Sequence, residues 1–431
     1  MASNLITLRI RRAALGAAVL LAASSPALGV RSAPTPAALA RATSSWTTAN
    51  PATSVLVWRL DPGEPVEILN YKADTPRRPA STMKVVTAAS ALLTLTPEFR
   101  FETRLYAGAN ARQNGTMLSG PLYLKGYGDP TLATGRYARR YLGTAGGVAD
   151  LARPLRDAGL RQVNGPLVVD ETFFDAVRRG PTWPSRYATE CPPLSATTVN
   201  QSYLGDRRIK YVKNPPKAAG AQLRIAMKAV GVRHSGVVRS GRAPEEGRLL
   251  ATHTSPPLRA ITRMMLPDSD NFLAEMLTKS VGAYGRNDGS TAGGTAHAVT
   301  VLGGMELLDA SDRLVDGSGL ALENRLTARS LVRVLTAADN DPIWGGPLIS
   351  SLPAGGEGTL TRRLRGPGVA GRVRAKTGYI RKTSTLAGLV DSPSGARYAF
   401  AILMNQGSLS GARATQDRIV TLLAAGVADF Q

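Results

Sequence analysis

Short apolar runs separated by turn residues occur at both ends of the chain. Near the start, the runs 54–58 and 66–69 flank Asp61-Pro62-Gly63, a spacing that predicts a β-hairpin. Near the end, the runs 385–390 and 398–403 flank the turn residues 391–395 and predict a second hairpin. A final helix is expected from about Arg413 to Ala428. The two ends therefore predict strands and a helix on either side of a long middle region.

The middle of the chain shows two different patterns. An almost continuous apolar stretch from Val85 to Leu93 predicts a buried helix that begins near Ser81. Between residues 100 and 250, short strands and turns prevail, with helical pieces at 148–158 and 221–230, which predicts one or two β-rich modules. Beyond them, Ser255-Pro256-Pro257 is expected to end an extended segment and to start a helix.

The first 50 residues have the layout of an exported protein. Arg9, Arg11 and Arg12 precede an apolar run from Ala13 to Ala23, and small residues follow, so residues 1–29 are predicted to be a signal peptide of the general secretion route. The run is too short to span a bilayer comfortably, although an uncleaved signal would tether the protein. Residues 30 to about 50 are expected to form a flexible lead. We therefore expect an extracytoplasmic protein, either periplasmic or associated with the cell wall.

The composition adds a strong positive charge and a single thiol. A formal charge of +22 predicts adhesion to anionic cell-wall polymers or to a lipid surface. Nucleic acid is not an expected partner, because the basic residues are dispersed, aromatic residues are few and the protein is exported. Cys191 is the single cysteine, so no intramolecular disulfide can form, and we expect it to be a small buried side chain rather than a reactive thiol.

Candidate chemistry begins at Ser81-Thr82-Met83-Lys84, the only Ser-x-x-Lys in the chain. Three residues along an α-helix advance by about 300° and rise by ~4.5 Å, so the two polar side chains share one helix face and the amine can reach the hydroxyl. The chain has three histidines and none lies in a nucleophile-elbow context, so lysine is the candidate base. To be half neutral near pH 7 its pKa must fall by roughly 3 units, which burial and a second nearby cation can achieve.

Two further motifs follow in order. Ser269-Asp270-Asn271 is expected in a loop before a helix, and Lys376-Thr377-Gly378 is expected on a strand that lines a cleft, where its lysine supplies the second cation. Lys382-Thr383-Ser384 is a weaker candidate for the third motif because it lacks the glycine that lets a backbone approach closely. With Ser-x-x-Lys, this ordered set resembles the penicillin-binding proteins and serine β-lactamases.

The spacing narrows the resemblance to one family. Lys84 and Ser269 lie 185 residues apart, which indicates a large insertion. Words along nearly the whole mature chain resemble D-alanyl-D-alanine carboxypeptidases of the penicillin-binding protein 4 type, peptidase family S13: Gly126-Tyr127-Gly128-Asp129-Pro130-Thr131-Leu132, Gly165-Pro166-Leu167-Val168-Val169-Asp170, Asp316-Gly317-Ser318-Gly319-Leu320 and Gly358-Thr359-Leu360. Without the resemblance, the residue types of Gly126–Leu132 and Asp316–Leu320 predict only turns.

The resemblance implies an α+β fold: an antiparallel sheet of the serine β-lactamase and DD-peptidase kind with flanking helices and a helical subdomain, plus inserted β-rich modules. Both ends of the chain then belong to one sheet. Residues 30–100 and 251–431 would form the peptidase domain and residues 101–250 the inserted region, for which the residues indicate no chemistry of its own.

The resemblance also implies roles for single residues. Ser81 would be the nucleophile, Lys84 its base, Ser269 a proton relay and Lys376 a source of positive field. Asn271 would hold a substrate amide, Thr377 the terminal carboxylate, and Ser81 and Tyr379 would donate backbone N–H groups to the oxyanion, while Gly378 lets the substrate approach. No metal or cofactor is expected. Peptidoglycan peptides would be substrates and β-lactam antibiotics covalent inhibitors.

Tyr379 departs from the family, which usually has a small hydroxyl residue at this position. The bulkier side chain puts in doubt how a carboxylate is held and whether free or cross-linked peptides are preferred. A β-lactamase shares all three motifs, but its compact form lacks the long insertion. A noncatalytic wall-binding or β-lactam-sensing protein is the other alternative, with Tyr379 as the residue that favours it.

Overall fold

A computed structural model describes residues 36–60 and 62–426, and the predicted signal peptide lies outside these ranges. Five antiparallel strands form one sheet in the order β12-β13-β14-β1-β2. They are β1 (Thr53–Arg59), β2 (Val66–Tyr71), β12 (Val373–Ile380), β13 (Thr383–Asp391) and β14 (Arg397–Met404). Both predicted hairpins are confirmed, and so is the expectation that the two ends of the chain share a sheet.

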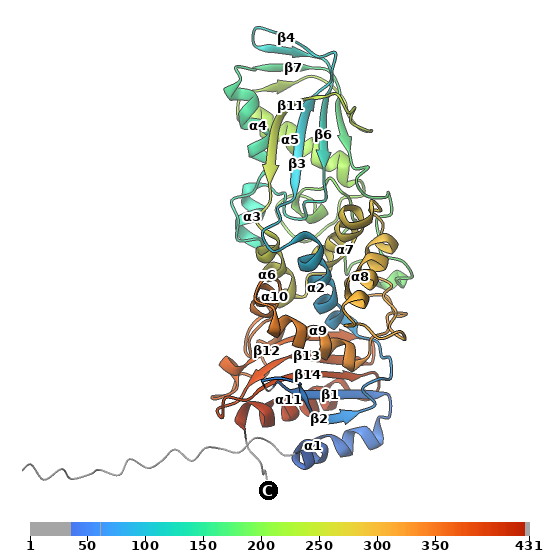
Figure 1. Cartoon of the computed structure of the whole chain (residues 1–431). Coiled ribbons are helices and arrows are strands. Elements are labelled where there is room, and N and C mark those ends of the chain that lie inside the picture. The colour runs from blue at the N-terminus through green and yellow to red at the C-terminus, as the bar shows by residue number, and fades with distance from the viewer. Residues whose placement is uncertain (1–35, 61, 427–431) are drawn as a thin grey trace, which may run out of the picture. The chain divides into compact units, whose positions relative to one another are not determined.

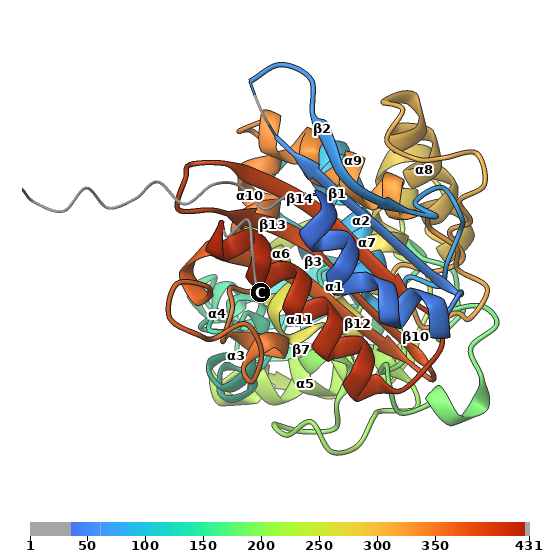
Figure 2. The same ribbon diagram turned by 90° about the horizontal axis from the view of Figure 1, so that it is seen from below.

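Two helices cover one face of this sheet. Figure 2 shows α1 (Pro36–Ala49) and α11 (Leu409–Ala425) lying across it. Their buried side chains, including Leu39, Ile419 and Leu423, pack with the apolar residues of the strands. The prediction of a flexible lead over residues 30–50 was therefore wrong for the described part. Leu39, Ala42 and Trp46 follow helical spacing, and tertiary packing stabilises a helix that Ser, Thr and Pro made look like a linker.

The last helix begins earlier than predicted and ends earlier. The Ser408 side chain accepts a hydrogen bond from the Gly411 N–H and caps the first turn, so the helix starts before Arg413. Gly426, with φ of +62°, ends it in the left-handed conformation that glycine adopts without penalty.

The other side of the sheet carries the helical part of the fold (Figure 1). Its members are α2 (Met83–Leu95), α6 (Leu258–Asp268), α7 (Asn271–Arg286), α8 (Thr291–Gly304), α9 (Ala328–Asn340) and α10 (Gly345–Ser351). The α2 helix is buried almost all round, as its apolar run predicts, and packs against α6, α7, α8, α9 and α10. Ser81 precedes it in a short 3₁₀ turn, Ala80–Thr82.

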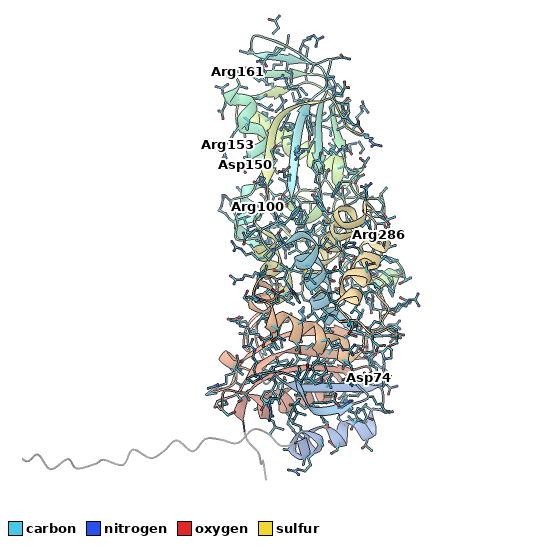
Figure 3. The ribbon with its side chains drawn as sticks, in the orientation of Figure 1. Asp74, Arg100, Asp150, Arg153, Arg161 and Arg286 are labelled. Carbon is cyan, nitrogen blue, oxygen red and sulfur yellow. The ribbon has the colours of Figure 1, made fainter. Side chains whose placement is uncertain are left out.

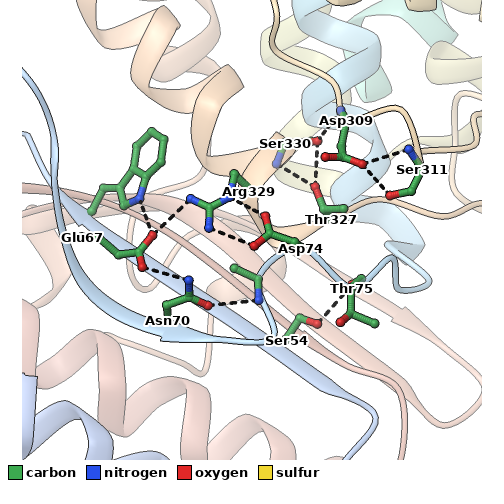
Figure 4. Close-up of polar contacts among 12 residues, drawn as sticks. Ser54, Glu67, Asn70, Asp74, Thr75, Asp309, Ser311, Thr327, Arg329 and Ser330 are labelled. Atoms are coloured by element: carbon green, nitrogen blue, oxygen red, sulfur yellow. Dashed lines mark hydrogen bonds and ion pairs between the residues drawn. The ribbon is translucent and has the colours of Figure 1, made fainter.

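An arginine joins α9 to the edge strand of the sheet. Figure 4 shows the Arg329 guanidinium between the carboxylates of Glu67 on β2 and Asp74 in the segment that leads to Ser81. Because both carboxylates are largely exposed, we expect this cluster to add little to the free energy of unfolding and chiefly to fix the orientation of α9.

Residues 102–254 form two further sheets. The larger has the order β10-β8-β6-β3-β11, and comprises β3 (Glu102–Ala107), β6 (Leu122–Gly126), β8 (Leu167–Asp170), β10 (Val238–Ser240) and β11 (Arg248–Thr254). The smaller has the order β4-β5-β7-β9, with β4 (Arg112–Asn114), β5 (Met117–Ser119), β7 (Gln162–Asn164) and β9 (Arg233–His234). Parallel pairings join β6, β8 and β10.

Three helices accompany these sheets: α3 (Gly135–Tyr141), α4 (Val148–Asp157) and α5 (Pro215–Ala229). The predicted helical pieces at 148–158 and 221–230 are confirmed, but α5 begins six residues early. Asn214 caps it by accepting from the Lys217 N–H, and Pro215 occupies the first turn, where a missing N–H costs nothing.

One histidine ties β11 to α4. The His253 ring lies between Asp150 on α4, 3.2 Å from Nδ1, and the buried Asp129, 3.5 Å from Nε2. Asp150 also pairs with Arg153 one turn along α4, and Figure 3 labels both residues. Burial lowers the pKa of His253, but the two carboxylates outweigh it and the pKa ends above its ordinary value. The two carboxylates thus favour the protonated ring, and Asp129 of the Gly126–Leu132 motif packs against it.

Within residues 36–60 and 62–426, no helix is both long enough and apolar enough to cross a membrane. In the same residues, no cluster of three or more histidine, cysteine or carboxylate side chains could hold a metal.

Candidate active site

Ser81 sits on a constrained turn at the start of the buried helix α2. Its side chain is partly exposed, whereas Thr82 and Met83 are buried. The preceding Ala80 has φ of +46°, a left-handed conformation that an alanine adopts only when its surroundings impose it. The Thr82 hydroxyl donates to the Pro79 carbonyl at 2.7 Å and closes the turn. The hydroxyl of Ser81 is therefore held at the surface end of a rigid helix.

Lys84 is the centre of the polar contacts around Ser81. Its fully buried Nζ donates to Ser81 Oγ at 3.0 Å, to Asn271 Oδ1 at 2.7 Å and to the Ser318 carbonyl at 2.7 Å. Burial lowers the pKa of the Lys84 amine to about 8, although nearby carboxyls, Asp316 foremost, act to raise it. The amine is thus both within reach of the hydroxyl and poised to be neutral at mildly alkaline pH.

The second motif lies at the junction of α6 and α7. Ser269 ends α6 with φ of +58°, and the Asp270 carboxylate caps α7 by accepting from the Leu273 N–H. Asn271 then starts α7 with its Oδ1 on Lys84 and its Nδ2 donating to the Glu190 carbonyl at 2.8 Å. Among the described residues, no hydrogen bond joins the Ser269 hydroxyl to Ser81 or Lys84.

The third motif is on β12, the edge strand next to the Ser81 turn. Lys376 is fully buried and donates to the Thr377 carbonyl at 2.8 Å. Burial first, and the charge of Lys84 second, hold the pKa of Lys376 well below its ordinary value. The Thr377 hydroxyl donates to the Thr359 hydroxyl, and the Tyr379 ring is 55% exposed, with the Arg413 guanidinium 6.0 Å from its centre.

Gly378 is where β12 touches the Ser81 turn. A Cβ atom at this position would lie 2.1 Å from Thr385 Oγ1, 2.8 Å from the Pro79 carbonyl oxygen and 2.9 Å from the Ser81 nitrogen. These distances are shorter than side-chain contacts allow, so only glycine lets the strand approach the turn this closely. From the sequence, Gly378 was expected to let the substrate approach closely. In the structure, Gly378 also lets strand β12 lie directly against the Ser81 turn.

Residues of all three motifs thus meet at the Ser81 turn and Lys84, although 185 residues separate Lys84 from Ser269 and 105 separate Asn271 from Lys376. A family model for the D-Ala-D-Ala carboxypeptidase 3 (S13) family matches residues 47–208 and 198–426. The chain belongs to this family. The S13 family predicted from the sequence is therefore confirmed, and with it a hydrolase of the D-Ala-D-Ala carboxypeptidase class.

Two relatives of this S13 member are carboxypeptidases, in agreement with the family assignment. It is 34% identical over 361 residues to a carboxypeptidase of Mycobacterium tuberculosis, over 81% of this chain and 76% of the relative. It is 31% identical over 407 residues to carboxypeptidase DacB of Mycolicibacterium smegmatis, over 91% and 85%. The fold resembles that of penicillin-binding protein 4 from Haemophilus influenzae, with a TM-score of 0.72 at 23% identity over 88% of this chain and 97% of that one. The predicted α+β DD-peptidase fold is confirmed.

The S13 word Asp316–Leu320 is part of the site, not only a turn. Its Ser318 carbonyl accepts from Lys84, and a Cβ on Gly319 would lie 1.9 Å from the Ala80 carbonyl oxygen, so the loop abuts the Ser81 turn. The Asp316 carboxylate accepts the N–H groups of Gly319 and Ala321, the Asn324 amide and the Trp183 indole. The composition of this loop did not predict a place in the active site, because Gly and Asp are common in turns of every kind.

The long insertion also contributes to the S13 site. Trp183 donates to Asp316 Oδ2 at 2.7 Å and the Glu190 carbonyl accepts from Asn271, so the segment 183–191 borders the site. The inserted region thus has a structural part in the site, because it holds Asp316 and Asn271 by hydrogen bonds. Cys191 in this segment is buried as predicted, and burial raises the pKa of its thiol well above the ordinary value.

Proposed function

We propose that this S13 member hydrolyses the bond between two D-alanines of peptidoglycan stem peptides through an ester on Ser81. The observation that carries the proposal is the 3.0 Å hydrogen bond between Lys84 Nζ and Ser81 Oγ, together with the pKa of about 8 that burial gives the amine. A hydroxyl becomes a nucleophile when an adjacent base accepts its proton, and a neutral lysine can act as that base.

The acylation step follows from these positions. Neutral Lys84 takes the proton of Ser81 while Oγ forms a bond to the carbonyl carbon, and the oxyanion receives the N–H groups of Ser81 and Tyr379. The C–N bond then breaks, and the proton that Lys84 took from Ser81 passes through Ser269 to the departing amine of D-alanine, which leaves Lys84 neutral. Water hydrolyses the ester and regenerates Ser81.

Binding of the substrate would change two contacts within the site. Asn271 uses both polar atoms on Lys84 and Glu190, so holding a substrate amide requires exchange of one of these hydrogen bonds. Lys376 is held toward its neutral form by burial, so the positive field expected from it depends on an anion such as the terminal carboxylate, which would favour the ammonium form. We assign that carboxylate to the Thr377 hydroxyl, which would exchange its hydrogen bond to Thr359 for one to the substrate.

Export and wall association are part of the proposal. The S13 relatives are bacterial carboxypeptidases, which supports an extracytoplasmic location. We propose that residues 1–29 direct export and that the net positive charge favours anionic wall polymers or lipid surfaces. We also propose the division into a peptidase domain, residues 30–100 and 251–431, and an inserted region, residues 101–250. A hydrogen bond of 2.9 Å from the Phe101 N–H to the Ser255 hydroxyl brings the two ends of the insertion together.

The rate of Ser81 acylation is expected to rise with pH through a midpoint near 8. The neutral amine is the reactive form and burial lowers the pKa of Lys84 to about 8, so the rate should be low near pH 6 and level off in mild alkali. Stopped-flow measurement with a fluorescent penicillin between pH 6 and 10 gives the profile. A rate that stays constant across this range would contradict the role of Lys84 as base.

Covalent labelling tests the function itself. The H. influenzae protein of the same fold has been determined in complex with a β-lactam, and we expect a β-lactam to add its mass to this protein, with the adduct mapped by peptide mass spectrometry to Ser81. Absence of an adduct, or an adduct on another residue, would overturn the proposal. Rapid loss of the adduct with release of hydrolysed drug would favour a β-lactamase. D-alanine release from a pentapeptide, compared with cleavage of a cross-linked dimer, separates carboxypeptidase from endopeptidase action.

A further inference from the structure

We propose that Glu275 is a positioning residue for Lys84: its carboxyl fixes the Ser318 backbone that receives the amine, and its negative charge helps to keep a proton on that amine. The inference rests on the proposed function, because it concerns the base of that reaction. None of the three sequence motifs contains Glu275. It lies on α7 four residues after Asn271, so both side chains leave the same face of the helix.

Glu275 holds the first of two successive peptide groups that lead to the Lys84 amine. Its Oε1 accepts the Ser318 N–H at 2.8 Å, and the carbonyl of that same peptide group, from Gly317, accepts from the Thr87 hydroxyl of α2 at 2.7 Å. In the next peptide group, the Ser318 carbonyl accepts from Lys84 Nζ at 2.7 Å and the Gly319 N–H donates to Asp316 Oδ1 at 2.8 Å. The carbonyl that faces the amine is thus held from α7, α2 and its own loop.

There is little room for the loop to move. A Cβ on Gly317 would lie 1.7 Å from Thr278 Oγ1 on α7, and a Cβ on Gly319 would lie 1.9 Å from the Ala80 carbonyl oxygen. The loop therefore fills the space between α7 and the Ser81 turn. If Glu275 loses its hold on the Ser318 N–H, we expect the packed loop to stay in place but this peptide group to lose its fixed orientation, so that the Lys84 amine loses its fixed distance to Ser81 Oγ.

Glu275 lies in a buried cluster with Lys84 and Asp316, and its charge can change with pH. Glu275 is fully buried, and its Oε2 has no hydrogen-bond partner among the described residues, in contrast to Asp316, whose two oxygens accept four hydrogen bonds. Burial, and then the charge of Asp316, raise the pKa of Glu275 to about 8, while Lys84 acts in the opposite direction. The charged or titratable groups that face it are Lys84 on α2, Asp316 on the loop and Cys191 on the segment from the insertion.

Two conservative substitutions separate the two effects. Glu275→Gln keeps an acceptor at the same reach and removes the charge, so the pH midpoint of β-lactam acylation should move down by less than about one unit. The shift is limited because the negative charge stabilises the ammonium form only in the molecules in which Glu275, with its pKa of about 8, is ionised. The rate at the alkaline plateau should stay within about threefold. Glu275→Asp keeps the charge but is one methylene too short for the Ser318 N–H, so the plateau should fall by about tenfold or more while the midpoint stays closer to that of the unmodified protein.

Ser280→Ala is the matched control on the same helix. Its hydroxyl is also fully buried and has no hydrogen-bond partner in the described part of the chain, but it faces Gly128 rather than Lys84. It should leave both the midpoint and the plateau unchanged. Thermal unfolding of each variant shows whether the protein remains folded.

The outcomes separate this inference from the proposed function. If the unmodified protein forms no adduct on Ser81, the proposed function fails. If it does form one, and Glu275→Gln keeps the midpoint or raises it, the electrostatic part of the inference is overturned. If Glu275→Asp keeps the plateau rate, the positioning part is overturned.

Discussion

Replacing Lys84 with methionine (Lys84→Met) is expected to slow acylation of Ser81 by a β-lactam about 10³-fold, the loss typical of removing a general base. Methionine has nearly the volume and shape of lysine but cannot accept a proton, so the hydroxyl of Ser81 keeps its position and loses its activation. The rise of the acylation rate between pH 7 and 9, expected for the unmodified protein, should be absent in this variant, because it depends on the pKa of about 8 that burial gives the Lys84 amine. Both results can be read from the rate of adduct formation by mass spectrometry.

Lys279→Met is the matched control for this prediction. Lys279 is also fully buried on a helix of the same core, and it pairs with Asp175 rather than with the Ser81 site. Losing this pair should lower the free energy of unfolding, since it leaves Asp175 without its cation, yet the acylation rate of the folded protein should be preserved. Ser81→Ala sets the blank for labelling. If Lys84→Met acylates at the unmodified rate, Lys84 is not the base.

Gly378→Ala is expected to reduce the acylation rate by about 10²-fold, with β-lactam labelling and D-alanine release affected alike. The added Cβ meets the Ser81 nitrogen at 2.9 Å and the Pro79 carbonyl oxygen at 2.8 Å, and neither backbone atom can turn away. The Thr385 hydroxyl, 2.1 Å from the same Cβ, is itself held by a hydrogen bond to Pro79. Strand β12 must therefore move off the turn, and the N–H groups of Ser81 and Tyr379 no longer converge on one oxyanion. Overpacking should also cost about 1–3 kcal/mol of the free energy of unfolding.

Gly371→Ala controls for substitution of a glycine near the same strand. Gly371 lies in the short turn before β12, and a Cβ there meets no atom within 4 Å. Its acylation rate and its melting temperature should match those of the unmodified protein. A Gly378→Ala variant that acylates as fast as Gly371→Ala would show that the contact between β12 and the Ser81 turn does not support the oxyanion site.

Much of the fold was predictable because its signals are local. The two terminal hairpins follow from apolar runs with turn residues between them, and α2 follows from an apolar run that only Thr87 and Ser90 interrupt. Helix α1 was missed because the prolines at and just before its start and the Ser and Thr residues within it resemble a linker, and contact with α11 stabilises the helix. The predicted start of α5 was six residues late, because the first turn, with Pro215 at its start and Asn214 as its cap, lacks the apolar run on which the prediction rested.

The motif residues of the site could be predicted from the sequence, whereas the residues that hold them in place could not. Lys84 stands one helical turn from Ser81 in the sequence itself, so their contact follows from helix geometry. Glu275 carries no comparable signal, because a glutamate on a helix is usually solvated, and only the packing of α7 against α2 and the Asp316–Leu320 loop buries it. Trp183 and Glu190 come from a region whose composition indicates no chemistry.

The sequence by itself determined the family, the order of the three motifs and the pairing of a serine with a lysine one turn away. Each rests on residue type and short spacing, which do not depend on the rest of the chain. Only the tertiary structure decided how deeply Lys84 is buried and which oxygen atoms accept its hydrogen bonds. It also decided why only glycine fits at position 378. These depend on distances between segments far apart in the chain, and burial sets the electrostatics of Lys84 only once those segments have packed.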